Sequence, residues 1–235
     1  MSAINAIIQR DAVHLLTDAA SYDSAGNLVA AIPKVALLPR INAAMACRGP
    51  RASVPLFCDL LNAAASSYDE LKAKAPTFLR DLRPMLAVTF AYCELGDDFD
   101  VVVAGISESV GPDAYLVCSH QRYGVEPWTV VQFGGLAMMP ADAAMKARVF
   151  ASIPDNVDLV DPERDGRIIL EAQRAFPMDH GGDRNFVGVG GFAQLTSITR
   201  EGISTRVIHR WSDEVGQPIG ASDILTAAAM LRAAA

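Results

Sequence analysis

Residues 1–38, around which the rest of the chain is organised, read MSAINAIIQRDAVHLLTDAASYDSAGNLVAAIPKVALL. Two apolar runs, residues 3–8 and 12–17, lie close to its start and are separated only by Gln9-Arg10-Asp11. Short apolar runs with β-branched side chains on either side of a polar break are typical of paired strands. The segment therefore predicts two strands joined by a tight turn at the beginning of the chain.

Single residues with reactive or charged side chains stand at the ends of these runs. Ser2 follows the initiator Met and begins the first run, and Asp18 directly follows the second. Lys34 stands between Pro33 and a further apolar run at residues 35–38. Because unlike charges attract when strand ends come together, we expect Asp18 and Lys34 to meet near the start of the chain.

With these residues at these positions, the segment resembles the N-terminus of the proteasome β-subunit and HslV family of N-terminal nucleophile hydrolases. Members of that family begin with a nucleophilic Thr and carry an Asp sixteen residues later and a Lys thirty-two residues after the nucleophile. Ser2, Asp18 and Lys34 keep this spacing without a gap. Similar flanking residues fall at Ile4, Arg10-Asp11 and Gly26-Asn27-Leu28. Past Gly49 the resemblance is one of pattern more than of residues.

The resemblance implies a hydrolase of peptide or other amide bonds in which Ser2 is the nucleophile. The α-amine of Ser2, with a reference pKa of about 7.7, would take the hydroxyl proton. Lys34 would lower that pKa, and Asp18 would hold Lys34 in place and balance its charge. The mechanism requires removal of Met1, which the small side chain of the second residue permits.

The other site positions follow the family pattern less closely. The resemblance assigns the oxyanion-binding backbone N–H to Gly49, with Arg48 as the alternative, and a supporting carboxylate to Asp179. Ala20 stands where many members carry Arg, and the family's supporting Ser would fall near Gly134-Gly135, which has no hydroxyl. Two alternatives therefore remain: an inactive homologue that serves as a self-assembling scaffold or binding protein, and a small-substrate amidase of the same superfamily.

Composition narrows the class of protein and its partners. Of the 235 residues, 51% are hydrophobic, but no apolar run approaches the roughly 20 residues that cross a bilayer. We expect a soluble, cytoplasmic protein without a secretory signal. A net charge of −7 from scattered residues argues against nucleic acid as a partner. Four separated cysteines and dispersed histidines predict free thiols, no metal and no cofactor.

The order of the predicted elements is strands, two helices, strands, two helices, strands. The helices are expected at residues 53–74, ended by Pro76, then 77–95 with a kink or new start at Pro84, and at 141–153, 162–176 and 221–235. Later strands are expected at residues 35–38, 41–47, 99–106, 114–118, 128–133, 188–199 and 203–210, with a turn at Gly111-Pro112-Asp113. This order predicts an α+β protein with one domain over residues 1–235, built as a four-layer α/β/β/α sandwich of two packed antiparallel sheets. The resemblance also implies a homo-oligomer.

Overall fold

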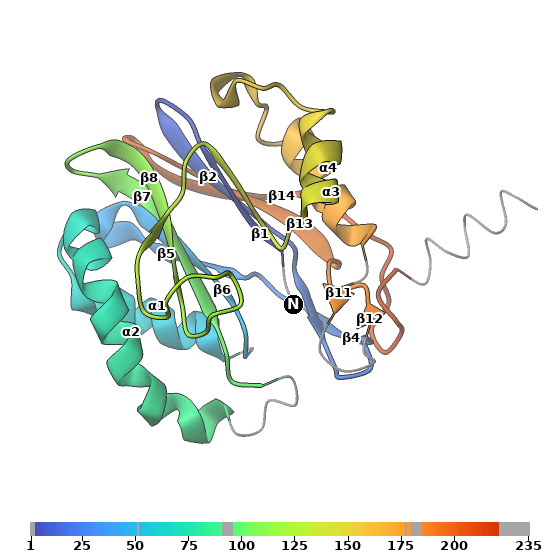
Figure 1. The fold of residues 1–235 in the computed structure, drawn as a ribbon, viewed down its shortest axis with the longest axis horizontal. Helices are drawn as coiled ribbons and strands as arrows, with labels where there is room; N and C mark the ends of the chain where they lie inside the picture. Colours follow the sequence, from blue (N-terminus) through green and yellow to red (C-terminus); the bar gives the residue numbers. More distant parts are fainter. Residues whose placement is uncertain (1–2, 51, 91–95, 177, 180–184, 221–235) are drawn as a thin grey trace, which may run out of the picture.

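The structure is a computed structural model that describes residues 3–50, 52–90, 96–176, 178–179 and 185–220 (Figure 1). Ser2, residues 91–95 of the second predicted helix, and the predicted helix at residues 221–235 lie outside the described residues. Among the described helices, none combines the length and the apolar character needed to cross a lipid bilayer.

Two five-stranded antiparallel sheets form the centre of the molecule. The first has the order β10-β1-β2-β13-β14, and the second has the order β5-β6-β7-β8-β9. The strands of the first sheet are β1 (Ile4–Ile8), β2 (Ala12–Thr17), β10 (Leu136–Met139), β13 (Phe192–Thr199) and β14 (Gly202–Arg210). Those of the second are β5 (Val35–Leu38), β6 (Ala43–Arg48), β7 (Asp100–Ser107), β8 (Gly111–Cys118) and β9 (Val131–Gln132). The predicted hairpin at the start of the chain is confirmed, because β1 pairs with β2 in antiparallel register from Ile4–Thr17 to Ile8–Val13.

Shorter elements complete the description. Two small antiparallel ribbons join β3 (Ala20–Tyr22) to β4 (Leu28–Ala31) and β11 (Met178–Asp179) to β12 (Asn185–Phe186). The α-helices among the described residues are α1 (Ser53–Ala64), α2 (Tyr68–Phe90), α3 (Ala143–Phe150) and α4 (Arg164–Arg174). Two single 3-10 turns are η1 (Pro39–Ile41) and η2 (Val157–Leu159).

Three apolar clusters show how these elements are layered. Between the two sheets lies a cluster that includes Ile4, Ala6, Val13, Leu15, Ala44, Ala46, Val102, Ala104, Ala114 and Leu116. Its many alanines let the two sheets approach closely. A second cluster packs α1 and α2 onto the outer face of the second sheet, and a third packs α3 and α4 onto the outer face of the first (Figure 1). The predicted arrangement of helices outside two antiparallel sheets is confirmed at this level.

The boundary between the first two helices differs from the prediction. Pro76 and Pro84 both lie inside α2, and the break between helices falls at residues 65–67 instead. There, Ser67 Oγ accepts a hydrogen bond from the N–H of Glu70, and a Glu70 carboxylate oxygen accepts one from the N–H of Ser66. Ser67 thus caps the start of α2, and Glu70 reaches back to the residue before the cap, an arrangement close to a capping box. Burial of one face of α2 against the second sheet offsets the hydrogen bond that each proline removes.

Two strand predictions were also wrong in detail. The β7–β8 hairpin turns at residues 108–110, while Pro112 lies within β8 opposite Ile106. The strand predicted at residues 128–133 shrinks to β9, because Trp128 adopts a left-handed φ of 61° that interrupts extended structure. β10 was not predicted from the sequence, and its pairing with β1 adds an edge strand to the first sheet.

Candidate active site at the Asp18–Lys34 pair

Asp18 and Lys34 form a buried ion pair at one end of the sandwich. Asp18 directly follows β2 of the first sheet, and Lys34 directly precedes β5 of the second, so the pair links the two sheets. Lys34 Nζ donates to Asp18 Oδ1 over 2.7 Å. The Asp18 side chain is fully buried, and 7% of the Lys34 side chain is exposed. The predicted meeting of these two residues is confirmed.

Three backbone N–H groups also donate to the carboxylate of Asp18. Ala3 donates to Oδ1 over 2.8 Å, and Ala20 donates to Oδ2 over 3.0 Å. Gly190 donates to Oδ2 over 3.2 Å from the loop that precedes β13. Hydrogen bonds from N–H groups favour the ionised form of a carboxylate and offset the cost of its burial. Each oxygen of the Asp18 carboxylate therefore accepts two hydrogen bonds.

The anchoring of Ala3 places the start of the chain against the ion pair. Ala3 is fully buried and packs in a cluster with Leu170, Val189 and Ala193. Its N–H shares Oδ1 of Asp18 with the ammonium group of Lys34. Ser2 is not described, but its peptide bond to Ala3 supplies this N–H. The residue predicted to be the nucleophile is thus one peptide bond away from a fixed contact with the pair.

The surroundings of Lys34 change its affinity for protons. Burial lowers the pKa of the Lys34 ammonium group, the charge and hydrogen bond of Asp18 oppose that shift, and the positive charge of Arg48 adds to it. Arg48 ends β6, which pairs with β5 so that Ala46 lies opposite Val35. The end of β6 therefore brings a second cation to the same side of the second sheet.

Gly49, the predicted oxyanion-binding residue, follows Arg48 at this end of β6. Its φ of +133° lies where residues with a side chain are rarely found. A Cβ at this position would lie 2.7 Å from the carbonyl oxygen of Asp98 and 2.9 Å from Cβ of Phe99. Only glycine fits there without displacement of the backbone. The placement agrees with a backbone role near Lys34, and the oxyanion role itself stays a prediction.

Two other predicted positions are not brought to the pair by any described contact. Asp179 lies in β11, with its backbone opposite Asn185, and its side chain is outside the described part of the structure. Gly135 accepts a hydrogen bond from the N–H of Ile8, at the end of β1 that is remote from Ala3. Gly134-Gly135 therefore lies toward the end of β1 away from Ala3, since β10 pairs with β1 in a register that puts Met139 opposite Ile4.

Gly190 is the site residue that sequence reasoning missed. The sequence predicts its segment, Gly188-Val189-Gly190-Gly191, only as the start of a strand. In the structure, Gly190 donates its N–H to Asp18 and accepts from the N–H of Ala19 over 3.1 Å. A contact made by backbone atoms across 172 residues leaves no side-chain signal in the sequence.

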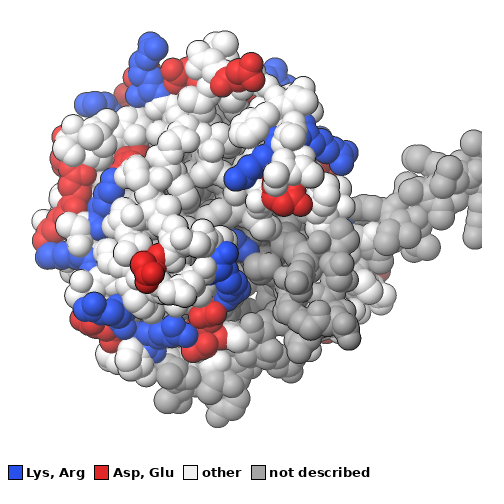
Figure 2. Space-filling model, viewed as in Figure 1, with Lys and Arg blue, Asp and Glu red and all other residues white. Residues whose placement is uncertain are grey.

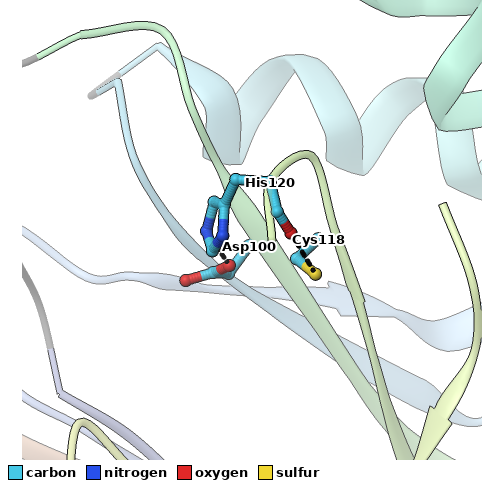
Figure 3. A group of neighbouring side chains, drawn as sticks. All are labelled: Asp100, Cys118 and His120. Carbon is cyan, nitrogen blue, oxygen red and sulfur yellow. Dashed lines mark hydrogen bonds and ion pairs between the residues drawn. The ribbon is translucent and has the colours of Figure 1, made fainter. Parts of the chain in front are cut away.

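A second polar cluster lies at the end of the second sheet, next to Arg48. Among the described residues, Asp100, Cys118 and His120 have potential metal-ligand atoms within 4.8 Å of one another, and all three are buried. Figure 3 shows the His120 ring directed at Asp100, with the Cys118 sulfur against the carbonyl oxygen of His120. Tyr123 donates its hydroxyl proton to Asp100 Oδ2 over 2.7 Å.

The hydrogen bonds of this cluster fit proton donors better than metal ligands. His120 Nδ1 accepts from the N–H of Arg122 over 3.2 Å, so the proton of a neutral ring sits on Nε2, 2.8 Å from Asp100 Oδ1. That nitrogen has no free lone pair for a metal. Burial raises the pKa of Cys118, which disfavours a thiolate ligand. Burial alone would raise the pKa of Asp100, but His120, Arg48 and Tyr123 together lower it.

Charged side chains of both signs lie around the face of the molecule shown in Figure 2. Figure 2 shows Lys and Arg interspersed with Asp and Glu on the face in view, without a continuous basic area among the described residues. A phosphate backbone needs a clustered basic surface. This face therefore offers no support for nucleic-acid binding.

Comparison with known proteins names no family for the chain. No protein-family model matches it, and no curated protein matches it significantly. Any assignment of function therefore rests on the residues and contacts around Asp18 and Lys34.

Proposed function

We propose that this chain is a proteasome-like N-terminal nucleophile hydrolase that cleaves peptide or other amide bonds, with Ser2 as its nucleophile after removal of Met1. One observation carries the proposal: the N–H of Ala3 and the ammonium group of Lys34 share one oxygen of the buried Asp18 carboxylate. This contact places the Lys34 side chain and the backbone of Ala3 on the same carboxylate oxygen, one residue after Ser2 in the sequence. The helices outside two antiparallel sheets support the same assignment.

The proposed chemistry uses the α-amine of Ser2 as a general base. A neighbouring cation such as Lys34 disfavours the protonated amine, so that more of it is free at neutral pH. The amine takes the hydroxyl proton as Oγ attacks the carbonyl carbon, and the backbone N–H of Gly49 stabilises the oxyanion that forms. The α-ammonium group of Ser2 then gives this proton to the leaving nitrogen as the C–N bond breaks. Water, deprotonated by the same amine, hydrolyses the ester on Ser2.

Asp18 has a supporting role in this proposal. Its charge opposes the lowering of the Lys34 pKa that burial causes, and its backbone donors hold the carboxylate in place. A buried ion pair can also be purely structural, as in an inactive scaffold. The experiment must therefore test the state and reactivity of the N-terminus directly.

The test is the intact mass of the untagged protein before and after treatment with a β-lactone probe. We expect the mass to lack Met1 and to gain a single adduct. Ser2→Ala should abolish the adduct, and Ser2→Thr should retain it because the hydroxyl and the amine are both kept. Ser152→Ala, in the turn after α3, is the matched control and should label like the parent chain.

Different outcomes separate the alternatives. Retained Met1 without an adduct would contradict the hydrolase and leave a scaffold as the better account. An adduct together with release of ammonia from small amides, and no cleavage of peptides, would identify a small-substrate amidase. Full labelling of Lys34→Met would remove Lys34 from the proposed mechanism.

A further inference from the structure

A second buried ion pair lies on the other side of the loop that holds Asp18. Arg174 is the last residue of α4, and Asp213 follows β14. Two parallel contacts join them, Nη2 to Oδ1 over 2.7 Å and Nη1 to Oδ2 over 3.0 Å. The Arg174 side chain is 5% exposed and that of Asp213 is fully buried. A bidentate pair of this kind fixes both distance and orientation.

This pair also binds the backbone of the loop before β13. Arg174 Nη1 donates to the carbonyl oxygen of Val189 over 2.7 Å, and Asp213 Oδ2 accepts from the N–H of Gly191 over 2.8 Å. A Cβ on Gly190 would lie 2.5 Å from Asp213 Oδ2 and 2.9 Å from Arg174 Nη1. The three loop residues therefore lie directly against the pair, with no room for a side chain between them.

The opposite side of the same loop contacts the candidate active site. Gly190 donates its N–H to Asp18 Oδ2 over 3.2 Å, and its carbonyl oxygen accepts from the N–H of Ala19 over 3.1 Å. One residue thus has the Arg174–Asp213 pair on one side and the Asp18 carboxylate on the other. A movement of the pair would reach Asp18 through a single peptide unit.

Gln173, the residue before Arg174 in α4, contacts β1 of the first sheet. Gln173 and Asn5 of β1 exchange two amide hydrogen bonds of 2.9 Å each. Gln173 also donates to the carbonyl oxygen of Pro140, at the end of β10, over 2.9 Å. The last turn of α4 is therefore tied both to β1, which begins at Ile4, and to the loop that contacts Asp18.

We propose that Arg174 and Asp213 are positioning residues, which hold the Gly190 loop at the place where its N–H fixes the Asp18 carboxylate and, through it, Lys34 and Ala3. The predicted effect on reaction rate rests on the proposed hydrolase function. The predicted effect on the order of the Gly190 loop does not depend on that function. Neither residue would touch substrate.

The test uses Arg174→Met, Asp213→Asn and the double variant. Each single change leaves an unpaired charge in the interior, so both stability and β-lactone labelling of Ser2 should fall. The double variant has no unpaired charge and should regain most of the parent's melting temperature. Its labelling rate should stay roughly tenfold or more below the parent value, because the loop is no longer held. A rate that recovers together with the melting temperature would overturn the proposal.

The matched control breaks a different ion pair. Asp113→Asn removes the partner of Lys72, whose Nζ lies 2.8 Å from the carboxylate where α2 packs on β8. This variant should lose stability but label at the parent rate. Slower labelling there, in proportion to lost stability, would show that the rate follows general destabilisation and would also overturn the proposal.

Amide hydrogen exchange supplies a readout that does not depend on activity. The N–H groups of Ala20 and Gly190 both donate to Asp18, and in the double variant they should exchange roughly tenfold faster. The N–H of Val103, in the middle of β7, should be unchanged. If the β-lactone does not label the parent protein, the hydrolase proposal fails. Amide hydrogen exchange at Ala20 and Gly190 would still test whether Arg174 and Asp213 position the loop. If the parent is labelled and the double variant matches it in rate and exchange, the positioning is wrong.

Discussion

Lys34 Nζ lies 2.7 Å from Asp18 Oδ1, in an ion pair that joins the end of β2 in one sheet to the start of β5 in the other. Burial of two charges costs free energy that their attraction recovers only when the remaining hydrogen-bonding capacity is also satisfied. For the carboxylate, backbone N–H groups meet that condition. The stability of the buried pair therefore depends on the backbone N–H groups that surround Asp18.

Removal of one partner should be far more costly than removal of both. Asp18→Asn leaves the Lys34 ammonium group buried beside a neutral amide, and we expect a loss of about 3–5 kcal/mol in the free energy of unfolding. The double variant Asp18→Asn/Lys34→Met should lose less than either single variant. Urea unfolding measures the loss of free energy in the single and double variants. Glu163→Gln, which breaks an exposed pair with Arg206, should cost less than about 1 kcal/mol. Equal losses for Asp18→Asn and Glu163→Gln would contradict this account.

Substitution of Gly49 should be costly for two reasons. Alanine there meets both an unfavourable φ of +133° and a carbonyl oxygen 2.7 Å from its Cβ. Gly124→Ala is the matched control, because its φ of +70° is also positive but nothing lies within 4 Å of the added methyl group. We expect Gly124→Ala to cost about 1 kcal/mol and Gly49→Ala to cost at least about 2 kcal/mol more in thermal or urea unfolding. Similar values for the two variants would show that the backbone around Gly49 shifts at little cost to accommodate a side chain.

Acid should weaken the fold through His14. This residue of β2 lies 2.9 Å from Ser197 Oγ and 3.0 Å from Gln9 Oε1 through its two ring nitrogens. Burial, together with the positive charge of Arg206, lowers the pKa of His14 from 6.5 to about 4. Between these values the unfolded chain binds a proton that the folded protein does not, so stability falls as pH drops from 6.5 towards 4.

The loss through His14 should reach about 2 kcal/mol between pH 6.5 and pH 5. Urea midpoints at pH 7, 6 and 5 measure it, above the range in which carboxylates titrate. His14→Gln should flatten the dependence on pH over this interval, because the side chain no longer titrates. A parent protein with the same midpoint at pH 7 and pH 5 would rule out a buried neutral imidazole.

The start of α2 should depend on Ser67. Its Oγ accepts from the N–H of Glu70 over 3.1 Å, a contact that alanine cannot make. Ser67→Ala should therefore cost about 1 kcal/mol in the free energy of unfolding. Ser67→Asp restores an acceptor at the same place and should recover most of the loss. If both variants unfold like the parent chain, the cap contributes nothing and burial alone sets the start of the helix.

Local patterns predicted much of the fold and one contact of the site. The runs at residues 4–8 and 12–17 pair as expected, because side-chain alternation and the polar break between them act over a few residues. The opposite charges of Asp18 and Lys34 at strand ends were also enough to predict their contact. Prediction failed where two local signals competed, as at Pro76, where burial of a long apolar face outweighed the helix-breaking tendency of proline.

Local sequence patterns specify the strands at the start of the chain, the helices outside them, and the charged residues at the strand ends. The contact of Gly190 with Asp18, and those of Arg174 and Asp213 with the loop around Gly190, arise only when distant segments pack together. Hydrophobic periodicity and helix capping depend on residues that are close together in the sequence, so they can be predicted from it. A backbone N–H, by contrast, is present at nearly every position, and its partner is chosen when distant segments pack together.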